Sequence, residues 1–257
     1  MKVFLDVGAH VGETLKPALD SRYRFDRIVC FEPVASCWPA LERLADGRVE
    51  ICRFGLANET RRAPIYDGGG LGASFFRTSV AEGTAKMAET RRASDWFREN
   101  INDDDHVYLK LNCEGSECDI LDDLLDSREV EKVKSIMVDF DVRKIPALAH
   151  REREVTKRFH LAGQGALILL KERCKGATHT ATIENWLQAT EPSISPPSTL
   201  WSLRYVRIPT LVRRVVFAGK GVMRNLLSSS SYERLRDLVQ RFIYGYPPNV
   251  RRRDKHG

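Results

Sequence analysis

Glycines and acidic residues in the first 32 positions have the spacing of a nucleotide-binding turn. The segment Asp6-Val7-Gly8-Ala9-His10-Val11-Gly12 follows an apolar run, and Glu32 ends the next apolar run. Glycines let the backbone turn tightly and let a ligand approach closely, and the free N–H groups of a following helix bind polar ligand groups. A carboxylate at the end of the second run can accept hydrogen bonds from ribose hydroxyls. We therefore predict a site for a ribose-containing cofactor at Asp6, Gly8, Ala9, His10, Gly12 and Glu32.

A second group of polar residues lies where a later apolar run ends and helical spacing begins, between Lys110 and Glu117. Ligands of open α/β sheets bind outside the carboxyl ends of the strands, so polar side chains at such a junction can line a binding site. The alternative is a structural role, in which Ser116 or Glu117 only caps the following helix. Four polar side chains are more than a turn requires, and we predict that they shape a site: Lys110, Asn112, Glu114 and Glu117.

The elements that position these residues follow from the alternation of apolar runs with segments of helical spacing. The predicted strands are 2–7, 27–32, 49–54, 107–111, 133–140 and 166–170, and the predicted helices are 12–22, 36–45, 94–100, a helix through 120–125, and 150–161. The glycine-rich segment 67–72 is expected to be a loop, and 89–92 a short extended piece. Strands and helices that alternate with short connections favour βαβ units. We therefore predict an α/β fold with a doubly wound, mostly parallel sheet.

Basic residues are concentrated at the end of the chain. The net charge is +6, but residues 200–257 contain 13 Lys or Arg and 3 Asp or Glu, so this part carries +10 and the rest −4. The segment 191–198 is rich in Pro and Ser, which is typical of a linker. We predict a globular domain over 1–190 and a basic, mainly helical appendage over 191–257. Within it, 208–227 forms an amphipathic helix that either docks on the domain or lies in a membrane interface.

Composition also bears on location and partners. No uncharged apolar stretch approaches the ~18 residues of a membrane span, and the first residues leave no room for the apolar part of a signal peptide. We therefore expect a cytoplasmic protein, and the membrane alternative for 208–227 would place it peripherally at the inner face of a membrane. No aromatic-interleaved motif supports specific nucleic-acid binding.

The six cysteines lack CxxC spacing, and we interpret them as small buried residues. The oligomeric state does not follow from the sequence.

Four motifs together resemble one known family. They are FLDVGAHVGET at 4–14, VCFEP at 29–33, GAS at 72–74 and LKLNCEGSECDIL at 109–121. In this order and spacing, over roughly the first 140 residues, they resemble the FkbM-type methyltransferases of the class I, Rossmann-like fold. The resemblance implies an O-methyltransferase that uses S-adenosylmethionine (SAM) and acts on a hydroxyl of a sugar, glycan or secondary metabolite.

The resemblance also implies roles for the residues named above. Gly8, Ala9 and Gly12 would surround the methionine part of SAM, and Glu32 would bind its ribose. Ser74 would line the adenine or acceptor side.

Methyl transfer needs the acceptor oxygen about 3 Å from the methyl carbon, and a hydroxyl acceptor must lose its proton. Glu114 is the first candidate for the base, and Lys110, Asn112 and Glu117 would shape its pocket. The next candidates are Asp139 and Asp141, followed by His10.

Two other functions stay open. An NAD-type oxidoreductase would share the sheet, but the chain lacks GxGxxG and contains the acidic pair around Gly115. A catalytically silent, membrane-attached binding module would keep the fold. Gly8, Gly12 and Glu32 argue against it, and Asn112 leaves it open because many family members have Asp there. The oxygen side chains of this segment and Asp139 are of the type that Mg²⁺ accepts, but no spacing demands a metal, and none is predicted.

Overall fold

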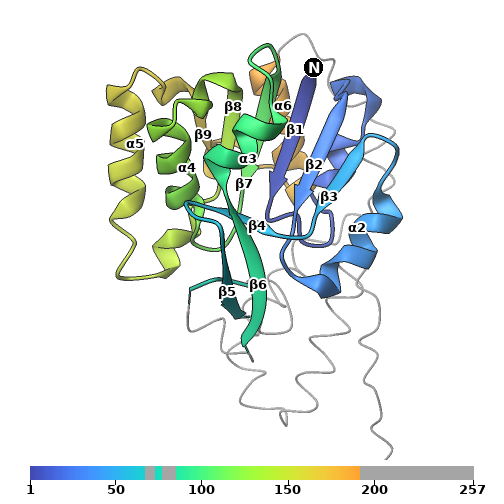
Figure 1. Ribbon diagram of the computed structural model, residues 1–257. Helices are drawn as coiled ribbons and strands as arrows, with labels where there is room; N and C mark the ends of the chain where they lie inside the picture. The colour runs from blue at the N-terminus through green and yellow to red at the C-terminus, as the bar shows by residue number, and fades with distance from the viewer. Residues whose placement is uncertain (67–72, 77–84, 192–257) are drawn as a thin grey trace, which may run out of the picture. The chain divides into compact units, whose positions relative to one another are not determined.

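The computed structural model describes residues 1–66, 73–76 and 85–191, and these contain a six-stranded sheet. Its order is β3-β2-β1-β7-β8-β9, and every neighbouring pair is parallel. The chain winds outward from β1 to β3 in one direction and from β7 to β9 in the other (Figure 1). The predicted doubly wound, parallel sheet is therefore confirmed. The strands are β1 (Lys2–Val7), β2 (Arg27–Phe31), β3 (Val49–Cys52), β7 (His106–Leu111), β8 (Val133–Val138) and β9 (Ile168–Leu170).

Both faces of this sheet are buried, which is why its strands are continuous apolar runs. Successive side chains of a strand point to opposite faces. Accordingly Leu5 belongs to a core with α3 (Ala93–Asn100), α4 (Glu117–Asp126) and α5 (Arg151–Leu161). Its neighbour Phe4 belongs to a separate core with three other helices, α1 (Leu15–Ala18), α2 (Trp38–Leu44) and α6 (His179–Thr190). Five of the six cysteines are buried, in agreement with their interpretation as small core residues.

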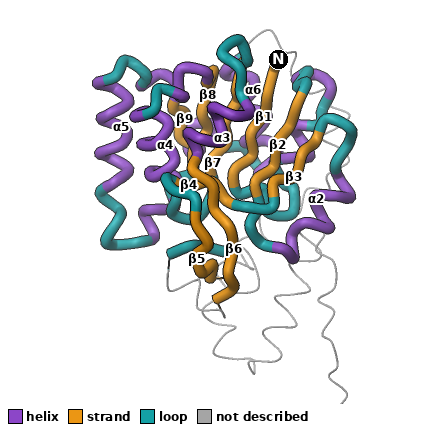
Figure 2. Tube along the Cα trace, in the orientation of Figure 1, coloured by secondary structure: helices purple, strands orange, loops and turns teal. Residues whose placement is uncertain are grey.

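A second, three-stranded sheet of order β4-β6-β5 was not predicted, apart from the extended piece at 89–92. It consists of β4 (Gly55–Ala57), β5 (Arg61–Tyr66) and β6 (Ala85–Arg92). Figure 2 shows that β5 and β6 extend beyond the carboxyl ends of the central strands. Only Ala88 and Thr90 of β6 are buried, so the strand lacks the apolar run that marks the central sheet.

The predicted helix 12–22 was wrong in its extent, because α1 contains only four residues. Gly12 has a φ of +89° and cannot be helical, and Pro17 has no N–H to donate. Asp20 is extended, and its carboxylate accepts from the N–H of Arg22 to cap a separate 3₁₀ turn. The helix therefore starts later and stops earlier than its apolar spacing predicts.

The segment 192–257 lies outside the described residues, as does the predicted loop 67–72. The predicted linker, the amphipathic helix 208–227 and the domain boundary near residue 190 therefore stay predictions. Within the described ranges, no helix has the length and apolar character needed to cross a membrane.

Candidate functional site

The glycine-rich turn after β1 is wedged between the ends of its two neighbouring strands. The N–H groups of Gly8 and Ala9 both donate to the carbonyl oxygen of Phe31 at the end of β2, at 3.1 Å. Gly8 has a φ of +79°, and a Cβ atom placed on it would lie 1.9 Å from the backbone oxygen of Asn112, just after β7. His10 also has a positive φ, of +50°. The absence of a side chain on Gly8 therefore lets the backbone of the turn pass this close to β7.

The carboxylate of Glu32 is fixed against this turn. Its Oε2 accepts from the N–H of His10 and its Oε1 from the N–H of Val34, both at 2.8 Å. Glu32 is buried, and burial raises its pKa, although the two N–H groups oppose the rise. Each carboxylate oxygen has a second lone pair, so this geometry leaves acceptor capacity for ribose hydroxyls. The structure thus brings together the turn and the acid that the sequence paired.

Lys110 and Asp6 form a buried ion pair beneath the turn. The Nζ of Lys110 lies 2.9 Å from Oδ1 of Asp6 and donates to the carbonyl oxygens of Gly8, at 2.8 Å, and Val7, at 3.3 Å. Burial raises the pKa of Asp6, and the neighbouring ammonium lowers it in part. Both side chains are buried, and the hydrogen bonds of Lys110 stabilise the backbone of the β1 turn.

The turn after β7 is held by two side chains that the sequence had placed at the ligand. Oε1 of Glu117 accepts from the N–H groups of Cys113, at 3.0 Å, and Gly115, at 3.1 Å. The hydroxyl of Ser74 donates to the carbonyl oxygen of Glu114 at 2.6 Å. Both side chains are buried and oriented toward the turn. Their contacts fix the position of Glu114, which has the left-handed φ of +54°.

The carboxylate of Glu114 belongs to a charge cluster at this edge. Its Oε2 lies 2.9 Å from Nζ of Lys144, which also lies 2.9 Å from Oδ1 of Asp141. Lys144 and Asp141 come from the 3₁₀ turn Asp141–Lys144 that follows β8. Burial and the negative charge of Glu114 raise the pKa of Asp141 to about 7, against the opposing effect of Lys144. The cluster therefore contains a carboxyl group that titrates in the neutral range.

An Asp141→Asn variant should gain stability relative to the wild type as the pH rises. The folded wild type keeps the Asp141 proton up to about pH 7, whereas the unfolded chain loses it near the ordinary aspartate pKa of 3.8. Between these pH values the folded state binds more protons, so wild-type stability falls with rising pH. The difference in unfolding free energy between variant and wild type should grow by roughly 2–4 kcal/mol from pH 4 to 8.

Urea denaturation at several pH values measures this difference. Asp104→Asn is the control, because Asp104 is exposed and its variant should follow the wild-type curve. Parallel curves for Asp141→Asn and the wild type would contradict the buried carboxyl group.

Two further titratable groups of the same edge, Lys171 and His179, were not among the predicted site residues. Asp139 is paired with Lys171, which follows β9. Nε2 of His179, the first residue of α6, lies 2.8 Å from Oγ1 of Thr14. Charged residues follow β8 and β9 in the sequence, and this pattern could have predicted that Lys144 and Lys171 lie at the site. The helical spacing of Ile183, Trp186 and Leu187 after the capping residue Thr178 could have predicted α6, and with it the position of His179 at the start of that helix.

His10, the third candidate for the base, is paired with Glu13 at 3.3 Å. Burial lowers its pKa, but the hydrogen bond to Glu13 and the charges of Glu13 and Glu32 produce a net rise. Its ring is therefore oriented by the turn in which it lies.

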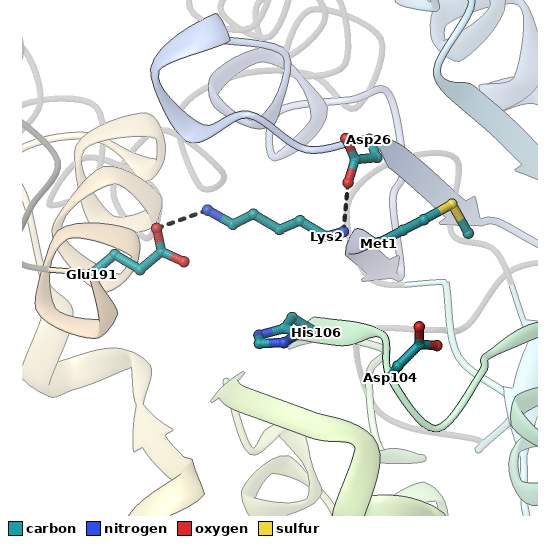
Figure 3. A pocket seen from close by; sticks show the side chains of 6 residues that line it. All are labelled: Met1, Lys2, Asp26, Asp104, His106 and Glu191. Carbon is teal, nitrogen blue, oxygen red and sulfur yellow. Dashed lines mark hydrogen bonds and ion pairs between the residues drawn. The ribbon is translucent and has the colours of Figure 1, made fainter.

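A surface cavity of about 310 Å³ lies at the opposite edge of the sheet (Figure 3). It is at the amino ends of β1 and β7, away from the glycine turn. Its lining residues are Met1, Lys2, Asp26, Asp104, His106 and Glu191. None of the predicted site residues is among them, so this cavity is separate from the candidate site.

Comparisons with known proteins agree with the motifs. The sequence profile described as "Methyltransferase FkbM domain" matches residues 6–159, which span the glycine turn, Glu32, the turn around Glu114 and Asp139. Among solved structures, the methyltransferase FkbM from Methylobacillus flagellatus KT is 19% identical, with a TM-score of 0.41. The match covers 61% of this chain and 37% of that one, so the present chain corresponds to little more than a third of that protein. No curated protein matches the sequence.

Proposed function

This chain belongs to the FkbM methyltransferase family, and from that membership we propose that it transfers the methyl group of SAM to a hydroxyl of a sugar, glycan or secondary metabolite. The family is one of SAM-dependent methyltransferases, which makes SAM the expected cofactor. The observation that carries the proposal is the assembly of the family's motifs at one edge of the sheet. There the glycine turn, Glu32 and Glu114 come from the ends of β1, β2 and β7.

The residues of this edge fit the cofactor. Glu32 is held by two N–H groups with lone pairs left for ribose hydroxyls. Gly8 lets the turn that carries Ala9 and His10 lie directly against the backbone of Asn112. Oδ1 of Asn112 is buried and has no hydrogen-bond partner among the described residues, so it can accept from a bound ligand. When bound, SAM supplies a methyl group activated by its positively charged sulfur.

We assign the proton transfer to Glu114. Its carboxylate accepts the proton of the acceptor hydroxyl, and Lys144 orients that carboxylate through the 2.9 Å ion pair. Ser74 fixes the backbone of Glu114 from the other side. The arrangement has the form of a base whose orientation is set by further groups, as general base catalysis requires.

Titration calorimetry with S-adenosylhomocysteine (SAH) tests the cofactor assignment. We expect the wild type to bind SAH with micromolar affinity, about 8 kcal/mol, and to bind NAD⁺ not at all. Glu32→Ala should weaken SAH binding by roughly 10- to 100-fold, since it removes charge-assisted hydrogen bonds to the ribose and releases the turn. The control Glu50→Ala, at an exposed position of β3, should bind like the wild type.

The outcomes separate the three candidate functions. NAD⁺ binding without SAH binding would replace the proposal with an oxidoreductase. SAH binding without methyl transfer to any of a panel of hydroxylated acceptors would favour the silent module.

A further inference from the structure

Two neighbouring phenylalanines, Phe75 and Phe76, lie in different surroundings. Phe75 packs against the small apolar core beside the end of β2. The N–H of Phe76 donates to Oγ of Ser74 at 3.0 Å, and its ring lies at the turn after β7. A Cβ atom placed on Gly115 would lie 2.8 Å from Cδ2 of that ring. Phe76 therefore packs on the bare α-carbon of Gly115, one residue after Glu114.

Ile145 reaches the same point from a distant segment of the chain. The Cβ atom placed on Gly115 would also lie 2.8 Å from Cδ1 of Ile145. Ile145 ends the turn that follows β8, and it is the next residue after Lys144, whose ammonium pairs with the carboxylate of Glu114 at 2.9 Å. Phe76 and Ile145, which we call the apolar pair, thus lie next to the proposed base and to the lysine that orients it.

The apolar pair is not part of the interior of the fold. None of the three apolar cores formed by the described residues includes either side chain, and both are only half-buried. Ligand sites are lined mainly by apolar and aromatic side chains, with a few polar groups that fix the orientation of the ligand. The edge near Glu114 has this composition, because the apolar pair lies beside a carboxylate and an ammonium group. It can therefore receive a ligand that is apolar on one side and polar on another.

We propose that the apolar pair binds the acceptor and selects one whose reacting hydroxyl is carried by a ring with an apolar face. That face packs on Phe76 and Ile145, and the hydroxyl at the rim of the ring is directed to Glu114. Such packing fixes the direction of the oxygen, which in-line methyl transfer requires. Neither residue of the pair lies in the four motifs that resemble the family. The inference rests on the proposed function and extends it from the hydroxyl to the group that carries it.

Saturation-transfer difference NMR on the full chain with SAH bound tests the apolar pair without a methyl-transfer assay. Cyclohexanol and methyl β-D-glucopyranoside are the ring probes, and glycerol is the probe that has hydroxyls but no ring face. The wild type should transfer saturation to the ring protons of at least one ring probe and far less to glycerol. The ring probe that binds distinguishes a carbocycle from a sugar. Phe76→Ala and Ile145→Ala should each lower its affinity by about 5-fold or more, the effect of a lost apolar contact, and Phe76→Tyr should retain it.

Calorimetry with SAH on the same preparations separates acceptor binding from folding. The three variants should bind SAH like the wild type, because the apolar pair contacts the acceptor and not the cofactor. Leu161→Ala is the control, since Leu161 is an aliphatic residue of α5 that is 77% exposed. This variant should keep the wild-type affinity for SAH and for the ring probe.

Three results would overturn the inference alone. They are ring-probe affinity at the wild-type level in either alanine variant, a parallel loss of SAH affinity in these variants, and a wild type that binds SAH but prefers neither ring probe to glycerol. A wild type that does not bind SAH would overturn the proposed function, and the inference with it.

Discussion

Replacement of Gly8 by alanine is expected to cost on the order of 3–5 kcal/mol of unfolding free energy, a large part of the 5–15 kcal/mol typical of a domain. The left-handed conformation at a φ of +79° costs a non-glycine residue about 1–2 kcal/mol. The new Cβ would lie 1.9 Å from the carbonyl oxygen of Asn112. That oxygen belongs to the backbone, so relief requires a shift of β1 against β7. The same shift would displace the turn that holds Glu32.

Gly47→Ala is the matched control for this variant. Gly47 lies in an exposed loop between α2 and β3, and a Cβ there would have no atom within 4 Å. Its substitution should leave stability unchanged or raise it by up to about 1 kcal/mol through the unfolded state. Urea denaturation of both variants gives the comparison. If Gly8→Ala lost less than about 1 kcal/mol, the close approach between the β1 turn and β7 would be contradicted.

The central sheet could be predicted because burial on both faces leaves a direct record in the sequence. The runs at 2–7 and 107–111 are apolar and end at polar site residues. The sequence therefore predicts both that these segments are strands and that their carboxyl ends face the site. No such record exists for β5 and β6. Most of their exposed positions are occupied by Arg, Lys or Glu, and only Ala63, Ile65, Ala88 and Thr90 are buried in the two strands.

The candidate site was predictable where one local segment supplies the chemistry. The pairing of the glycine turn with Glu32 follows from their order along two adjacent strands. The individual contacts could not be predicted in the same way. Whether Glu117 points to a ligand or to the N–H of Gly115 depends on the path of the five-residue turn 112–116. The roles of Lys144 and His179 depend on which distant segments meet at the edge, and apolar periodicity does not encode that.

Glu114→Gln is expected to lower the turnover number for methyl transfer by 10²- to 10⁴-fold, the usual contribution of a general base, while SAH affinity stays within about 2-fold of the wild type. The substitution keeps the size of the side chain and removes its ability to accept the hydroxyl proton, together with the negative charge that pairs with Lys144. Ser74 contacts the backbone of this residue, so its hold on the turn survives. Single-turnover rates and calorimetry on the same preparation separate the two effects. Glu99→Gln, at an exposed position of α3, should change neither.

Lys144→Ala distinguishes a base from a merely structural carboxylate. Without the ammonium, the negative charges of Glu114 and Asp141 are no longer offset by Lys144, so the rate should reach its plateau at a higher pH than in the wild type. The rate at that plateau should stay below the wild-type value, because the carboxylate loses the contact that orients it, but above that of Glu114→Gln, which lacks the base. If Glu114→Gln kept full turnover while Asp141→Asn lost it, the proton would go to Asp141 instead. That assignment is the one other that the cluster allows, since Asp141 is the second carboxylate on the same lysine.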